Sequence, residues 1–162
     1  IGFLLIALGV LVLDILTKRL VVATMSLHEV RRVFGDVARL TYIRNPGAAF
    51  GLFPGSRWPL IVISILAVVV VIVVAWRPQT RRSTLIPLGL ILGGAIGNLI
   101  DRVRLGEVVD FIQIGIPPHY WPVFNAADSA VSIGVVWLAI GLVLCDKPRE
   151  QPDAVAPSRL DG

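Results

Sequence analysis

The sequence predicts an all-α polytopic membrane protein with four transmembrane helices and a small β-sheet outside the bilayer. Of its 162 residues, 56% are hydrophobic and 16% are charged, and the mean hydropathy is +0.81. A soluble domain of this size exposes too much surface to bury so many apolar side chains, whereas a bilayer accommodates them. Three uncharged apolar runs, each close to the roughly 20 residues that cross the hydrocarbon layer, occur at Trp58–Trp76, Ser83–Ile100 and Ser129–Cys145.

The first predicted span, Ile1 to about Val22, is equally apolar but carries three charged residues, Asp14, Lys18 and Arg19. Ile1–Leu13 lacks a basic leader and a small-residue cleavage site, so we expect a membrane span and not a cleaved signal peptide. An even number of spans places both termini on the same side of the membrane.

The connections on the other side are predicted to form the β-structure. Runs of β-prone residues at Val30–Phe34 and Val37–Ile43 flank Gly35–Asp36, which indicates a hairpin. A further β-prone run, Val108–Ile114, follows the third span. The segment after it is predicted to be an interfacial loop with aromatic anchors, formed by Pro117, Pro118, Tyr120, Trp121 and Pro122.

The basic residues predict the topology. The short turn Arg77–Arg82 and the tail after Asp146 are rich in lysine and arginine, so we expect both to be cytoplasmic. The connections 24–57 and 101–127 would then be extracytoplasmic, although the first of them carries five arginines of its own. We expect one membrane-embedded domain over residues 1–146, followed by a polar, flexible cytoplasmic tail over residues 147–162.

Composition excludes several classes of site. Cys145 is the single cysteine, and His28 and His119 are the only histidines, so neither a disulfide framework nor a zinc cluster is expected, and no cofactor is predicted. The basic residues lie between apolar runs, where they suit lipid headgroups and not nucleic acid. Glycines recur every four residues at Gly89, Gly93 and Gly97, a pattern that lets transmembrane helices approach closely.

Carboxylates at membrane depth are costly and therefore candidates for function. Asp14 and Lys18 are one helical turn apart and are expected to form an ion pair, with substrate contact as the alternative. Asp101 precedes Arg102, whose guanidinium is expected to keep that carboxylate ionised in a structural or orienting role. Asp146, beside a lysine at a helix end, is expected to be solvated.

Asp110 and Asp128 have no cationic neighbour in the sequence and lie on either side of a short proline-rich link. Two carboxylates that share a site cannot both ionise easily, so one keeps its proton. Such a pair can activate water with one member and protonate the substrate with the other. The structural alternatives are a helix N-cap for Asp128 and a hydrogen-bonded edge-strand carboxylate for Asp110.

Three asparagines, Asn45, Asn98 and Asn125, are the other notable polar residues near these segments. Buried amides usually satisfy neighbouring polar groups, and Asn98, one turn before Asp101, is placed to orient a carboxylate or a substrate. No nucleophile elbow is present and Ser129 has no histidine nearby, which disfavours a serine hydrolase.

Five sequence blocks, in order, resemble the signature blocks of the signal peptidase II (prolipoprotein signal peptidase) family. They are Asp14–Lys18, Arg44–Gly51, Gly93–Arg102, Val108–Ile112 and Phe124–Ala130. The resemblance implies a bacterial inner-membrane aspartic endopeptidase with four helices, an extracytoplasmic β-cradle and neither metal nor cofactor. It implies cleavage of diacylglyceryl-modified prolipoproteins before the lipid-bearing cysteine, and inhibition by globomycin, a cyclic peptide.

The same resemblance implies roles for individual residues. Asp110 and Asp128 fall on the catalytic aspartates. Positions that line or support the active site are Asp14, Lys18, Asn45, Asn98, Asp101, Arg102 and Asn125. The sheet and the stretch Ala48–Phe53 are expected to cover the site and to hold the signal peptide through main-chain hydrogen bonds.

Two other classes of function stay open on the sequence alone. A small proton-coupled transporter would use the intramembrane aspartates as a relay, with carboxylates at several depths in the membrane. Asp101, Asp110 and Asp128 are instead expected near one face, which favours a single site. A non-enzymatic assembly or chaperone subunit would not depend on the chemistry of Asp110.

Overall fold

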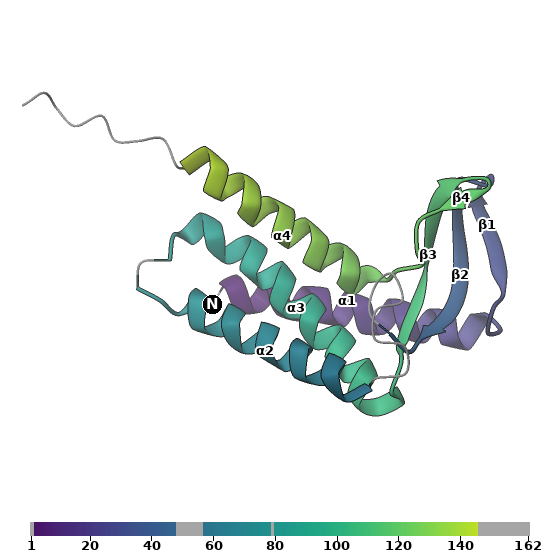
Figure 1. Ribbon diagram of the computed structural model, residues 1–162, viewed down its shortest axis with the longest axis horizontal. Helices are drawn as coiled ribbons and strands as arrows, with labels where there is room; N and C mark the ends of the chain where they lie inside the picture. Colours follow the sequence, from purple (N-terminus) through teal and green to yellow (C-terminus); the bar gives the residue numbers. More distant parts are fainter. Residues whose placement is uncertain (1, 48–56, 79, 146–162) are drawn as a thin grey trace, which may run out of the picture.

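The computed structural model of the protein describes residues 2–47, 57–78 and 80–145. The predicted cover at Ala48–Phe53 and the predicted tail after Asp146 lie outside these residues. The described part contains four α-helices and four β-strands. The helices are α1 (Gly2–Thr24), α2 (Arg57–Ala75), α3 (Arg82–Leu105) and α4 (Ala126–Cys145). They run alongside one another, and the sheet stands at one end of the bundle (Figure 1).

All four predicted helices are present, with two shifted boundaries that affect the site. The third helix was expected to end near Ile100 but continues to Leu105, where Gly106 adopts a left-handed conformation with φ 80° and ends it. The fourth begins at Ala126, three residues before the expected Ser129. These extensions place Asp101 and Asp128 within helical turns, where the sequence had placed them at the ends of the spans.

Close packing of α3 against α1 depends on the predicted glycine face. A methyl group at Gly93 would lie 2.5 Å from the Ala7 carbonyl oxygen, and one at Gly89 would lie 2.9 Å from that of Phe3. At Gly97 the obstacle would be the carboxylate of Asp14, at 2.5 Å. The predicted packing role of these glycines is therefore confirmed, and at Gly97 the absent side chain makes room for a site residue.

The sheet is antiparallel in the order β1-β2-β3-β4, with strands Val30–Phe34, Ala38–Asn45, Val108–Ile116 and His119–Tyr120. The predicted hairpin is confirmed, and Gly35 supplies the positive φ, 52°, that its turn requires. The third strand runs two residues beyond its predicted end. The proline-rich segment was expected to be an interfacial loop. Most of it is turn or coil, but His119 and Tyr120 form β4, which pairs with β3 at Gly115 and Ile116.

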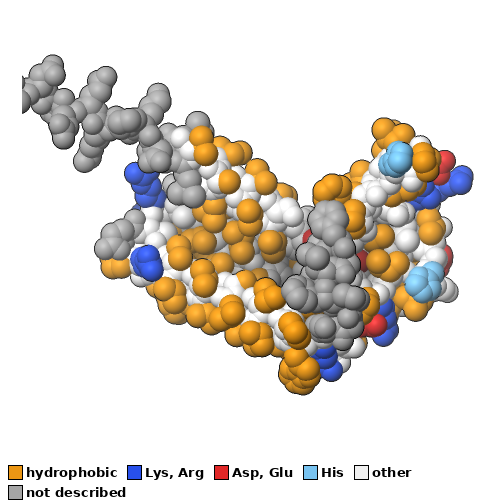
Figure 2. Space-filling view, in the orientation of Figure 1, with side chains coloured by type: hydrophobic (Ala, Val, Ile, Leu, Met, Phe, Trp, Pro, Cys, Tyr) orange, Lys and Arg blue, Asp and Glu red, His pale blue; other side chains and the backbone are white. Residues whose placement is uncertain are grey.

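The helices present apolar side chains to their surroundings. Figure 2 shows hydrophobic residues covering the flank of the bundle, with lysines and arginines gathered toward its ends. Among the described residues, α2 and α3 are long and apolar enough to cross a membrane. Trp58 and Trp76, 72% and 73% exposed, flank α2 and are about 27 Å apart along a helix that rises 1.5 Å per residue. Tryptophans at that spacing suit the two interfaces of a bilayer.

Candidate active site

Asp110 lies on β3, facing the helices, and is only 1% exposed. In the register of the sheet Ile43 is opposite Asp110, so Asn45, two residues on, is its diagonal neighbour on the same face. The Asn45 Nδ2 donates to one carboxylate oxygen of Asp110 at 2.9 Å, and Asn125 Nδ2 donates to the other at 2.7 Å. Both oxygens of this buried carboxylate therefore accept hydrogen bonds.

Asp128 lies in the first turn of α4 and shares a reciprocal capping interaction with Asn125. The Asp128 backbone N–H donates to Asn125 Oδ1 at 2.9 Å, and the Asn125 backbone N–H donates to Asp128 Oδ2 at 3.2 Å. The N-cap of α4 is thus Asn125, and the alternative that made Asp128 the cap is wrong by three residues. Asn125, fully buried, contacts both candidate catalytic carboxylates and fixes them near each other.

Asn98 on α3 connects this pair to the rest of the site. Its Nδ2 donates to Asp128 Oδ1 at 2.7 Å, and its Oδ1 accepts from Asn125 Nδ2 at 3.1 Å. The same oxygen accepts from Lys18 Nζ at 3.1 Å. Asn98 therefore contacts a carboxylate, as one of its two expected roles requires.

Lys18 on α1 is the cationic centre of the network. Its Nζ lies 2.7 Å from Asp14 and 2.9 Å from Asp101, so the predicted pair is confirmed and gains a second carboxylate. The cation that pairs with Asp101 is this lysine and not the neighbouring Arg102, because α3 turns Asp101 toward α1. Asp14 accepts from the Ala127 backbone N–H at 3.0 Å, which ties α1 to the start of α4.

Arg102 was expected to act on Asp101 but has other surroundings. Its Nη1 donates weakly to the Asn98 carbonyl at 3.5 Å, and its buried Nε has no hydrogen-bond partner among the described residues. The side chain lines the same pocket as Asp110 and Asp128. A guanidinium so placed is available to a ligand's oxygen atoms.

Burial and the nearby charge of Asp128 raise the pKa of Asp110 to about 7, against 3.8 for a free side chain, although hydrogen bonds from Asn45 and Asn125 oppose the rise. The cause is the cost of placing a negative charge in an apolar site beside another carboxylate. At neutral pH a large share of Asp110 is therefore protonated. A protonated and an ionised carboxylate can act together as acid and base.

Both carboxylates open into a pocket of about 990 Å³ between the sheet and α4, where the surface is hollowed in Figure 2. Its apolar wall includes Ile43, Phe124 and Ile133. An apolar groove of about 550 Å³ continues from Ser132 and Ile133 along α4 to Ile140. Sequence reasoning missed these α4 residues, although Ser132 lies one helical turn after Asp128 and that spacing places them on one face.

The structure brings together all nine predicted site residues in one network. In the described part of the chain no three or more histidine, cysteine, aspartate or glutamate side chains are grouped so as to hold a metal ion. Asp14, Asp101, Asp110 and Asp128 are linked through Lys18, Asn98 and Asn125. They form one site and not a series of separate relay positions.

Comparison with known proteins identifies the family of this chain. The family model described as signal peptidase (SPase) II matches residues 6–144. The chain belongs to the signal peptidase II family. It is therefore a peptidase and a membrane protein, and no finding favours the transporter alternative.

Individual signal peptidase II relatives match over most of their length. The lipoprotein signal peptidase of Syntrophomonas wolfei is 42% identical over 145 residues, covering 90% of this chain and 94% of the relative. That of Moorella thermoacetica is 44% identical over 144 residues, covering 88% and 93%. A bacterial membrane enzyme solved by the in meso method at 2.3 Å resolution superposes with a TM-score of 0.87 and 31% identity, covering 94% of each chain.

Proposed function

We propose that this chain is an aspartic endopeptidase that removes signal peptides from diacylglyceryl-modified prolipoproteins, cleaving before the lipidated cysteine, with Asp110 and Asp128 as its catalytic residues. The observation that carries the proposal is the pair itself. Two carboxylates are held by one buried asparagine, Asn125, in an apolar pocket of a chain from the signal peptidase II family. The reaction needs no cofactor.

The two aspartates take different roles. Asp110, with its raised pKa, holds the proton, and Asp128 is the base. Asp128 takes a proton from water as the water oxygen attacks the scissile carbonyl carbon, while Asp110 donates its proton to the carbonyl oxygen. Collapse of the tetrahedral intermediate breaks the C–N bond, and the proton held by Asp128 passes to the leaving amine. The carbonyl oxygen returns its proton to Asp110, which restores both residues.

The surrounding residues position the pair and the substrate. Asn98 and Asn125 fix the carboxylates, while Lys18 pairs with both Asp14 and Asp101. Arg102, whose side chain lines the pocket, would hold a main-chain carbonyl of the substrate through its guanidinium and orient the scissile bond.

The apolar groove along α4 suits the lipid on the substrate. It joins the pocket at Ser132 and Ile133 and ends at Trp137 and Ile140. Acyl chains attached to the cysteine would lie in it while the bilayer supplies the remaining apolar contact. A globomycin-type cyclic peptide with an apolar tail would occupy the same pocket and compete with the substrate.

We also propose four membrane spans, with both chain termini and residues 77–82 in the cytoplasm and the sheet and active site near the extracytoplasmic face. Figure 1 places the α2–α3 turn at the opposite end of the bundle from the sheet. We expect single cysteines introduced into a Cys145→Ser background to differ in reactivity. One at Gly35 should be labelled by an impermeant reagent added outside intact cells, and one at Arg77 should not. External labelling at Arg77 would reverse the topology.

The rate of cleavage should fall as pH rises through about 7, because Asp110 then loses the proton that it donates. The hydrogen bond from Asn45 favours the ionised carboxylate, so Asn45→Ala should raise the pKa of Asp110 and move this alkaline limb to higher pH. The measurement is kcat/KM against pH, which reports the free enzyme. An alkaline limb that stays in place or moves to lower pH in Asn45→Ala would contradict the assignment of Asp110 as the acid.

A further inference from the structure

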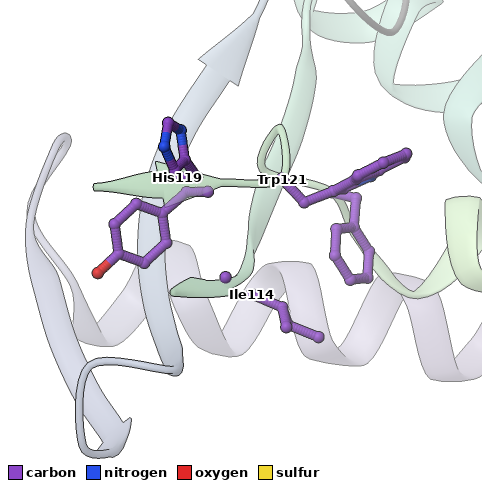
Figure 3. A pocket seen from close by; sticks show the side chains of 6 residues that line it. Ile114, His119 and Trp121 are labelled. Atoms are coloured by element: carbon purple, nitrogen blue, oxygen red, sulfur yellow. The ribbon is translucent and has the colours of Figure 1, made fainter. Parts of the chain in front are cut away.

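A second pocket, of about 610 Å³, lies on the sheet beyond the active site. We name it the hairpin pocket because the β3–β4 hairpin and the segment after it form its walls. Its lining residues are Ile114, Gly115, His119, Tyr120, Trp121 and Phe124. Figure 3 shows Ile114 on β3 and Trp121 after β4 reaching toward the same side of the hairpin, with His119 farther along β4. The proposed mechanism does not use this pocket.

The hairpin pocket adjoins the active-site pocket. Trp121 and Phe124 line both pockets, so they form the wall between them. The main chain holds this wall in place: Phe124 and Ile112 exchange two backbone hydrogen bonds, at 3.0 and 2.7 Å, and the Trp121 N–H donates to the Ile114 carbonyl at 2.8 Å. A substrate chain that runs from Asp110 and Asp128 along β3 therefore comes next to the hairpin pocket.

The spacing along β3 sets the distance between the catalytic carboxylate and the hairpin pocket. Ile114 is four residues after Asp110 on the same strand, and a strand rises about 3.3 Å per residue, so the pocket begins about 13 Å from the catalytic carboxylate. An extended peptide advances about as far for each residue. The fourth substrate residue after a scissile bond held at Asp110 would therefore lie at the hairpin pocket.

We infer that the hairpin pocket binds the third to fifth residues of the mature lipoprotein, counted from the lipidated cysteine as residue one. This inference rests on the proposed function. The acyl chains would occupy the α4 groove. The signal peptide would remain with the membrane helices, which differs from the expectation from the sequence that the sheet holds it. The mature chain is the one part of the substrate that leads away from the bilayer, and the sheet stands beyond the ends of α2, α3 and α4, over the last turns of α1 (Figure 1).

The lining indicates which side chains are preferred. Ile114, Trp121 and Phe124 supply apolar and aromatic surface. The Tyr120 hydroxyl already donates to the Asp36 carbonyl at 3.1 Å, and the Tyr120 ring is stacked by Arg39 at 3.8 Å, so this ring is held as a wall. The pocket thus favours an apolar or aromatic residue over a carboxylate, which would meet little compensating polarity.

The test uses purified enzyme and synthetic diacylglyceryl prolipoprotein peptides that share one signal peptide and differ only at mature residue four, as Leu or Asp. Wild-type enzyme should prefer the Leu peptide in kcat/KM by about 10-fold, the usual worth of one apolar side chain in a pocket. Ile114→Ser and His119→Asp should each reduce this preference severalfold. Ile116→Ser is the matched control, because Ile116 is an exposed residue of the same strand that does not line the pocket.

Each outcome decides a separate claim. Equal cleavage of the two peptides by wild-type enzyme would overturn the hairpin pocket as a substrate site while leaving the proposed function intact. An equal loss of kcat/KM on both peptides in Ile114→Ser and His119→Asp would also overturn it. The hairpin would then contribute to membrane association or folding and not to substrate selection. Absence of wild-type cleavage on every peptide would instead refute the proposed function. A peptide that ends at mature residue two should be cleaved equally by wild type and all three variants.

Discussion

Asp110→Asn and Asp128→Asn should each abolish cleavage of a diacylglyceryl prolipoprotein, by roughly 10⁴-fold or more, as is typical when one member of a catalytic unit is removed. Asparagine retains the size of the side chain but exchanges no proton. Without Asp128 the attacking water lacks its base, and without Asp110 the carbonyl oxygen lacks its acid. The loss should appear in kcat, because both residues act on the reacting atoms.

The double variant should be scarcely worse than either single one, since the two residues act as a unit. Asp36→Asn is the matched control: Asp36 is an exposed carboxylate at the tip of the β1–β2 hairpin, paired with Arg32 at 3.0 Å. It should cleave at the wild-type rate. Circular dichroism in the detergent used for the cleavage assay should show unchanged helix content in all variants. Measurable turnover by either folded single variant would remove the pair from the mechanism.

Lys18→Met should be among the most destabilising single substitutions in the described part of the chain. Lys18 is 5% exposed and Asp14 is 0% exposed, and removal of the lysine leaves two carboxylates without their counter-charge. Breaking a buried ion pair from one side costs about 3–5 kcal/mol in the free energy of unfolding. The measurement is equilibrium unfolding in mixed detergent at neutral pH.

A double-mutant cycle separates this pair from a general loss of packing. The combination of Asp14→Asn with Lys18→Met should cost less than the sum of the single substitutions, because Asp14→Asn removes a carboxylate that Lys18→Met leaves without its counter-charge. Arg19→Met removes the same charge from an exposed position of α1 and should have a small effect. Additive costs in the Asp14–Lys18 cycle would show that the two residues are not energetically coupled.

Periodicity and spacing predicted most of the fold. The apolar runs are long enough to identify all four helices, and the Gly35–Asp36 turn identified the first hairpin. The segment from Pro117 to Pro122 was predicted to be a loop, which holds for its prolines and Trp121 but not for the two residues between them. β4 forms there as a strand of only two residues, His119 and Tyr120, at the edge of the sheet.

The residues of the site could be predicted from the sequence, but the contacts between them could be predicted only in part. Burial of charged and amide groups in an apolar chain pointed to Asp14, Asp110 and Asp128. Which group pairs with which depends on how the helices rotate about their axes, and sequence neighbours do not report that. Asp101 was therefore assigned to Arg102 although α3 turns it toward Lys18 on α1. Asn125 was recognised as polar, but its role as the link between both carboxylates follows only from the meeting of β3 with the start of α4.

The most direct test of the aspartate mechanism is mass spectrometry of one diacylglyceryl prolipoprotein after incubation with purified wild-type enzyme or Asp128→Asn, with and without EDTA. The account predicts that wild-type enzyme releases a mature chain beginning with the lipidated cysteine, equally in EDTA because a chain with two histidines and one cysteine offers few metal ligands. Asp128→Asn should release none. Cleavage at another bond, cleavage by Asp128→Asn, or loss of wild-type cleavage in EDTA would contradict it.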